Sequence, residues 1–249
     1  MSFYVTLPSD SSMEYFPNNT ISHFVTHLPR PIELTGEWEV GVSEFSFPHT
    51  FYNINETNNT YVYDLGDGRI YDGEITPGYY NSVKAILNAI RIDAFQDLIE
   101  FSFNPVCNCV RISVNHGAKF MFKDGLAQIM GFYPKFISQP TIPSEFPHNV
   151  YGPFPADPCG DYRVMMLYTD IIRDQIVGNI LAPLLRIINV KGDHNEMVLV
   201  QFDRPHYLPV VRKNINSLEM VIRTHAGNLV PFERGRSYVK LHFRQKYLS

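Results

Sequence analysis

The strongest constraint on the fold of this chain is the alternation of apolar and polar residues in several segments. In "YVKLHFRQ" (238–245), Val239, Leu241 and Phe243 alternate with charged or polar residues, so one face of an extended segment is apolar. "SLEMVIRT" (217–224) repeats the pattern. Half-buried strands of antiparallel sheets have this period of two. Because no regular succession of strands and helices appears, the chain is predicted to be mainly β and antiparallel, not a parallel α/β enzyme fold.

One alternating segment, "GEWEVGVSEFSF" (36–47), changes phase in its middle. Its apolar residues occupy even positions up to Val42 and odd positions from Phe45. In a regular strand such a change moves the apolar side chains to the other face. We therefore predict a bulge or bend between Val42 and Phe45. The first half of the strand then lines the core, and Phe45 and Phe47 face a rim where a neighbouring element or subunit would lie.

Turn-forming residues divide much of the chain into short strands. "TYVYDL" (60–65) and "RIYDGEI" (69–75) flank "GDG", and "LAPLLRIINV" (181–190) and "EMVLVQFD" (196–203) flank "KGDHN". Both turns are predicted to join hairpins.

The middle of the chain has a different pattern. "YYNSVKAILNAIRIDAF" (79–95) predicts an amphipathic helix of about three turns, with Asn81 or Ser82 as N-cap. "FKDGLAQIMGF" (122–132) predicts a short helix ended by Gly131, and "LIEFSF" and "CVRISV" predict a strand pair between them. Six prolines in 138–160 predict an extended connector. We therefore predict a β-sandwich from residues 1–65 and 138–249, with an α+β insertion at 66–137.

Composition limits the cellular setting. The chain has 249 residues, three cysteines and no basic segment followed by an apolar run at its N-terminus. Three cysteines do not form a disulfide framework and indicate a reducing compartment. The sequence also lacks a signal peptide pattern and an apolar stretch of membrane-spanning length. We expect a soluble, intracellular protein with no membrane partner.

Charge is unevenly distributed along the chain. The net charge is −4, yet residues 210–249 contain eight basic residues against two acidic ones. A basic surface there could face nucleic acid or an acidic partner, and the alternative is a solvated sheet face. The candidate basic patch consists of Arg223, Arg234, Arg236, Lys240 and Arg244.

Motifs that carry catalysis are not found. The sequence contains no GxxxxGK[ST], HExxH, GxSxG or EF-hand pattern. Cys107 and Cys109 could lie on one side of a strand, but a structural zinc site usually needs four ligands and no second pair has suitable spacing. We therefore predict no catalytic residues, no metal site and no cofactor.

The chain resembles a known family over nearly its whole length. The resemblance begins with "FYVTLPSDSSMEYFPNNTISHFVTHLPRPIELTGEWEVGVSEFSFPHTFYNI" and continues in order through "PGYYNSVKAILNAI", "LAQIMGF", "VYGPF", "VGNILAPLLRII", "PHYLPV" and "GRSYVKLHFR". These blocks are similar to minor capsid proteins of Polinton (Maverick) transposons and adintoviruses. One departure is Asn179, where that family would have aspartate, and no predicted role depends on it.

The resemblance implies a penton-type protein similar to virophage vertex proteins. Such a protein is an antiparallel jelly-roll sandwich with an insertion, assembled as a non-catalytic homopentamer at the fivefold vertices of an icosahedral shell. Implied partners are other copies of the chain, a double-jelly-roll major capsid protein and, through a weak contact, packaged DNA. The implied location is the virion, after assembly in the host nucleus or cytoplasm.

A closed fivefold ring requires two different, complementary faces on each subunit. We predict that these faces use sandwich edges and the segment around residues 1–20, whose aromatic residues lack the pattern for a core of their own. The candidate interface residues are Phe3, Tyr4, Tyr15, Phe16, Phe45 and Phe47.

Two alternative functions are compatible with the sequence. A jelly roll that binds a ligand or glycan could stack sugars on Tyr79, Tyr80 or Trp38, although Trp38 fits a core position better. A cupin-like or hydrolytic enzyme would need a cluster of histidines and carboxylates along a strand, which the sequence does not reveal.

Overall fold

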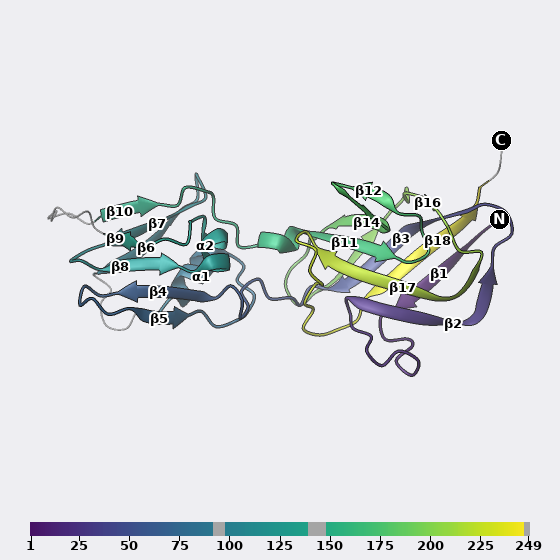
Figure 1. The fold of residues 1–249 in the computed structure, drawn as a ribbon, viewed down its shortest axis with the longest axis horizontal. Coiled ribbons are helices and arrows are strands. Elements are labelled where there is room, and N and C mark those ends of the chain that lie inside the picture. Colours follow the sequence, from purple (N-terminus) through teal and green to yellow (C-terminus); the bar gives the residue numbers. More distant parts are fainter. Residues whose placement is uncertain (92–97, 139–147, 247–249) are drawn as a thin grey trace. The chain divides into compact units, whose positions relative to one another are not determined.

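The computed structural model describes residues 1–91, 98–138 and 148–246. It contains two compact units (Figure 1). We call residues 1–51 with 161–249 the sandwich unit, and residues 52–160 the inserted unit. Each unit has its own hydrophobic core.

The first sheet of the sandwich unit is antiparallel and joins the two ends of the chain. Its strands are, in spatial order, β1 (Ser2–Pro8), β18 (Tyr238–Gln245), β3 (Trp38–Pro48) and β15 (Met197–Gln201), and β16 (Leu208–Pro209) also pairs with β3. Ser2 pairs with Arg244, so purple and yellow strands lie side by side in Figure 1.

The second sheet is also antiparallel. Its order is β14 (Leu184–Asn189), β11 (Val164–Thr169), β17 (Asn214–Thr224) and β2 (His23–Glu33). Between β11 and β14 the chain forms a small separate hairpin of β12 (Gln175–Val177) and β13 (Ile180–Ala182). A 3-10 turn, η1 (Gly160–Arg163), precedes β11.

The order of these strands defines a jelly roll. Numbered along the chain, the eight main strands give sheets of order 1-8-3-6 and 2-7-4-5. Apart from β11 and β14, which are neighbours in the second sheet, successive strands cross from one sheet to the other, as in a double Greek key. The predicted fold class, a mainly β, antiparallel jelly-roll sandwich with a small α+β insertion, is confirmed.

The phase change in β3 is a β-bulge. Lys240 of β18 pairs with Glu44 and Leu241 pairs with Val42, so Ser43 is the extra residue. The extra residue restores the alternation, and Val42 and Phe45 point to the same side. Phe45 and Phe47 have no exposed surface. The predicted bulge is confirmed, but the prediction that these two side chains face the rim is wrong.

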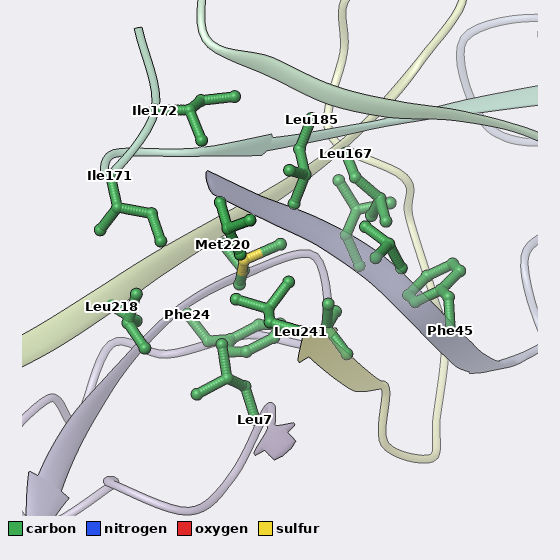
Figure 2. Packing of buried hydrophobic residues seen from close by; sticks show 14 of the residues in the cluster. Leu7, Phe24, Phe45, Leu167, Ile171, Ile172, Leu185, Leu218, Met220 and Leu241 are labelled. Carbon is green, nitrogen blue, oxygen red and sulfur yellow. The ribbon is translucent and has the colours of Figure 1, made fainter. Parts of the chain in front are cut away.

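Side chains from both sheets fill the core around this bulge. Figure 2 shows Phe45 and Leu241 from the first sheet in one cluster with Leu167 and Met220 from the second. Phe24 of β2 closes the same cluster and is fully buried. The predicted core position of Trp38 is also confirmed, since its ring is buried.

The described residues of the inserted unit form two antiparallel sheets and two short helices. One sheet is ordered β5 (Tyr71–Glu74), β4 (Thr60–Asp64), β8 (Lys119–Phe122), β9 (Ile137–Ser138). The other is ordered β10 (His148–Tyr151), β7 (Cys109–Val114), β6 (Ile99–Asn104). The helices are α1 (Val83–Ala89) and α2 (Asp124–Met130).

Both helices follow their sequence signals at one end. The Ser82 hydroxyl accepts the N–H of Ala85 and caps α1, and Gly131 ends α2 in the left-handed region. Helix α1 is shorter than the predicted three turns because Ile90 is already extended. The last part of the predicted helix, from residue 92, lies outside the described residues.

The compact units divide the chain at different places from those expected, 1–65 and 138–249 for the sandwich and 66–137 for the insertion. Strand β4 pairs with β8, which keeps residues 60–64 in the inserted unit. Strand β10 extends the sheet of β7, although it lies in the proline-rich segment that we expected to be an irregular connector. Its four residues contain no proline, so every N–H is available for pairing.

The two predicted hairpins differ in outcome. Strands β4 and β5 pair as expected around "GDG", where the Asp64 carboxylate accepts the N–H groups of Gly66 and Gly68. Strands β14 and β15 do not pair, because one belongs to each sheet. The "KGDHN" segment is a crossing between sheets, and the predicted hairpin there is wrong.

Candidate assembly surfaces of the sandwich unit

The predicted N-terminal interface residues occupy one edge of the sandwich. Strand β1 is the end of its sheet, with Tyr4 exposed on its outer side and Phe3 turned towards Phe243, at a ring-centroid distance of 5.0 Å. Tyr15 follows in the segment between β1 and β2 and is 62% exposed. Phe16 beside it is half-buried.

This edge is ordered by specific contacts. The ring of Tyr15 stacks on His27 of β2 at 4.5 Å. The Ser12 hydroxyl accepts the N–H of His27, and the Ser12 carbonyl accepts the N–H of Phe16 at 2.8 Å. The aromatic side chains are therefore held in place while they face solvent. Their role in an interface stays a prediction.

Phe45 and Phe47 are brought to a different place from the other four candidates. Both are enclosed in the core, and their rings stack at 5.0 Å. A side chain without exposed surface cannot contact a partner directly. We therefore withdraw these two residues from the candidate interface.

The candidate basic patch is distributed over both sheets and is largely neutralised. Lys240 and Arg244 lie on β18 and form ion pairs with Glu44 and Glu39 of β3. Arg236 pairs with Asp10 at 2.7 Å. The two remaining candidates donate to oxygen acceptors at 2.8 Å, Arg223 to the Gly227 carbonyl and Arg234 to the Asn195 side chain.

Strand β18 belongs to the first sheet and Arg223 to the second, so the five residues do not share one sheet face. Carboxylates beside three of the five reduce their attraction for phosphate. A DNA contact at these residues stays a prediction.

The outer face of the first sheet contains a cluster of rings and charges. Tyr4 stacks on His242 at 4.4 Å, and the Tyr207 hydroxyl lies 2.7 Å from Nδ1 of His242. The guanidinium of Arg244 lies 3.5 Å above the Tyr207 ring. Burial, and then the charge of Arg244, lower the pKa of His242. These contacts hold the side chains of the cluster against one another on the outer side of the β1–β18 pair.

Two further histidines lie near the end of β3. The rings of His49 and His194 are 6.0 Å apart, and Nδ1 of His49 donates to the Gly192 carbonyl at 3.0 Å. Burial lowers the pKa of both imidazoles, and the positive charge of Arg234 further lowers that of His194. The two imidazoles close the region where the "KGDHN" crossing meets β3.

The β12–β13 hairpin is an apolar surface that sequence reasoning missed. Ile176 and Leu181 are cross-strand partners and are 83% and 69% exposed, and Ile180 is also exposed. The buried Ala182 and a hydrogen bond from the Gln175 side chain to the Leu184 carbonyl tie the hairpin to β14. The signal in the sequence was "QIVGNIL", in which apolar residues flank a Gly-Asn turn.

Features typical of metal or membrane sites are not seen in the part of the chain that the structure describes. In residues 1–91, 98–138 and 148–246, no three His, Cys, Asp or Glu side chains are grouped as a metal site would need. Cys107 and Cys109 are free thiols. No helix within the described ranges is long and apolar enough to cross a bilayer.

Comparison with known proteins identifies the fold. No family model matches the sequence, and no curated protein matches it. Among solved structures, the chain is similar to the crystal structure of the selenomethionine-labelled mavirus penton protein, with a TM-score of 0.50 and 11% identity. The similarity covers 99% of this chain and 100% of the other. It therefore extends over both compact units and shows that the chain has a penton-like capsid fold.

Proposed function

We propose that this chain is a structural capsid protein that forms homopentamers at the fivefold vertices of an icosahedral shell and catalyses no reaction. The observation that carries the proposal is the end-to-end likeness in fold to a penton protein. A fold alone does not determine a function, so the proposal also rests on the ordered resemblance of the sequence blocks to Polinton and adintovirus minor capsid proteins.

The architecture suits a vertex subunit. Two sheets packed over one core make a rigid wedge, and its edges carry exposed apolar side chains that a monomer would leave in water. As partners we propose further copies of this chain and a double-jelly-roll major capsid protein. As location we propose the virion, after assembly inside the host cell.

Contact with packaged DNA is a lesser part of the proposal. Because ion pairs hold Arg236, Lys240 and Arg244, we expect only weak binding that is lost as salt concentration rises. Equal binding at low and high salt would contradict a phosphate contact.

One observation favours a second candidate function, glycan attachment. In the inserted unit, Tyr133 and Phe154 are exposed, and their rings meet edge to face at 5.3 Å. Exposed aromatic faces can stack on sugar rings. Tyr80, a residue considered earlier for this role, is half-buried and donates its hydroxyl to Thr76.

Native mass tests the proposal most directly. The purified chain should have five times the 28.7 kDa mass of one copy and should form five-lobed rings under the electron microscope. A monomer at every accessible concentration, together with specific glycan binding that Tyr133→Ala abolishes, would replace the vertex function by the attachment function.

A further inference from the structure

Exposed large apolar residues of the sandwich unit fall into two groups at opposite edges. One group follows the N-terminus, at the edge formed by β1 and β2. The other lies on β12 to β15, at the edge formed by β14 and β15. The sheet orders place these edges at opposite ends, since β1 and β15 end one sheet and β2 and β14 end the other. Val211 and Leu229 lie outside both groups.

Contacts within the unit show which edge strands belong together. Tyr15, which follows β1, stacks on His27 of β2. At the other edge, Arg186 of β14 lies 4.2 Å from the ring centre of Phe202, directly after β15. Each edge of the sandwich is therefore shared by one strand from each sheet.

We call the first surface the N-terminal face; it consists of Met1, Tyr4, Met13, Tyr15 and Phe16. Four of these side chains are exposed and Phe16 is half-buried. The segment that carries Tyr15 and Phe16 is held by hydrogen bonds to Ser12 and to β2. An ordered apolar surface loses little conformational entropy when a partner covers it.

We call the second surface the hairpin face; it consists of Ile176, Ile180, Leu181 and Ile187. A two-stranded hairpin is only marginally stable in water without an apolar face to pack on. Here the cross-strand pair of Ile176 and Leu181 points into solvent, although Gln175 and Ala182 fix the base of the hairpin. The exposed pair has the properties of an anchor for another molecule.

Glu14 and Arg186 give the two faces charges of opposite sign. Glu14 lies in the segment of the N-terminal face, and Arg186 lies on β14 beside the hairpin. Asp10, the other acidic residue of 1–16, is already paired with Arg236, and Asp174 directly precedes β12. Contact between the two faces therefore brings together apolar surfaces with one complementary pair of charges, Glu14 and Arg186.

We infer that the N-terminal face of one copy of this chain binds the hairpin face of the next copy, head to tail. This inference rests on the proposed pentamer and names the two surfaces that close it. A ring requires two different faces on each subunit, and the sandwich provides them at its two edges. The occupant of each face is a second copy of the same chain.

The first experiment measures the native mass of full-length variants by sedimentation. In the hairpin variant, Ile176→Asp with Leu181→Asp, charges replace the exposed cross-strand pair. A matched control, Ile70→Asp with Val106→Asp, makes equally exposed substitutions in the inserted unit. We expect the hairpin variant to sediment as one chain and the control to keep five chains. Circular dichroism spectra should show that all remain folded.

Mixing two defective variants tests the head-to-tail arrangement itself. The N-terminal variant, Met13→Asp with Tyr15→Asp, keeps an intact hairpin face, and the hairpin variant keeps an intact N-terminal face. We expect each variant alone to be monomeric and an equimolar mixture to form a species of two chains that grows no further. A mixture that contains only monomers at the highest soluble concentration would overturn the inference.

The outcomes separate this inference from the proposed function. A monomeric wild-type chain would overturn both. A pentameric wild type whose hairpin variant is also pentameric would leave the proposed function intact and overturn only the assignment of faces. If that variant kept its ring but no longer joined the major capsid protein, the hairpin face would bind the surrounding shell instead.

Discussion

The two compact units differ in how far apart in the sequence their paired strands lie. The sandwich unit pairs strands from the two ends of the chain, so that Ser2 lies beside Arg244. The inserted unit folds from one continuous stretch, and its β6–β7 hairpin closes within residues 99–114. Local pairings form with a smaller loss of chain entropy than distant ones. The comparison indicates that the inserted unit can form early, whereas the sandwich needs the complete chain.

The ends of the inserted unit are joined by one side chain. The Asn53 amide donates to the carbonyls of Tyr80 and Pro158, and its oxygen accepts the N–H of Tyr80. The unit thus holds its own entry and exit close together, as loop-inserted domains need. In the sandwich unit, β3 pairs with β18, β15 and β16, so its stability depends on the correct register over the whole strand.

The sharpest test of this difference is deletion of Ser43. Without the bulge residue, Phe45 and Phe47 move to the outer face, because a shift of one residue reverses every side chain of a strand. We expect the sandwich unit to lose about 5 kcal/mol or more of stability and the inserted unit to stay folded. Amide hydrogen exchange should show loss of protection in β3 and β18 but not in β7. Equal loss in both units would contradict their independence.

The Asp64→Ala variant should destabilise the inserted unit, by less than the deletion of Ser43 destabilises the sandwich unit. The Asp64 carboxylate is 2% exposed, pairs with Lys119 at 2.9 Å and accepts two turn N–H groups. Its removal breaks the ion pair and two hydrogen bonds to a charged group, which costs about 1–3 kcal/mol. Denaturant unfolding followed by hydrogen exchange should place the loss in β4 and β8, with β3 unchanged. Asp67→Ala, in the same turn, is the exposed control.

These cases show which parts of the fold the sequence predicts. Alternation and turn residues identify β18, β17 and the β4–β5 hairpin because their signals are local. The bulge at Ser43 is visible as a phase change, but its effect depends on the pairing with β18, which lies some 200 residues away. For the same reason "KGDHN" resembles a hairpin turn, although β14 and β15 pair with different sheets.

Prediction of the candidate interface residues has the same limit, because local patterns do not show pairings between distant segments. The exposure of Tyr4 and Tyr15 could be predicted because aromatic side chains without a core pattern stand out in the sequence, and their role in an interface stays a prediction. The burial of Phe45 and Phe47 could not, since it follows from the bulge. The β12–β13 hairpin was missed because strands of three residues are too short to establish a period. The exposure of Ile176 depends on where the hairpin lies in the folded chain, which a local sequence pattern does not show.

As the pH falls, the sandwich unit should lose stability before the inserted unit does. The pKa values of His49 and His194 lie below the ordinary 6.5 in the sandwich unit, mainly through burial. The unfolded chain therefore binds protons first as pH falls below about 6.5, and the sandwich loses stability there. The pKa of Asp64 lies below 3.8 because of its bond to Lys119, so the inserted unit loses that contribution only below about pH 3.8.

Denaturant unfolding from pH 8 to pH 3, with hydrogen exchange to assign the transitions, measures this order. The His49→Gln variant should reduce the loss between pH 6.5 and 5, because one proton-binding site of the unfolded chain is removed. If the inserted unit lost stability at a higher pH than the sandwich unit, the expected order would be wrong.

The smallest expected effect concerns the ion pair beside the bulge. Lys240 and Glu44 lie 2.8 Å apart with about a third of each side chain exposed, whereas the Asp64 carboxylate that pairs with Lys119 is buried. Solvent screens exposed charges, and such pairs contribute about 0.2–1 kcal/mol. A double-mutant cycle of Lys240→Ala and Glu44→Ala should therefore give a coupling in that range, which decreases as salt is added. The corresponding cycle of Lys119→Ala and Asp64→Asn should give a larger coupling that depends less on salt. Equal coupling energies with equal salt dependence would contradict this expectation. They would show that burial of the Asp64 carboxylate does not strengthen its ion pair relative to the exposed pair of Lys240 and Glu44.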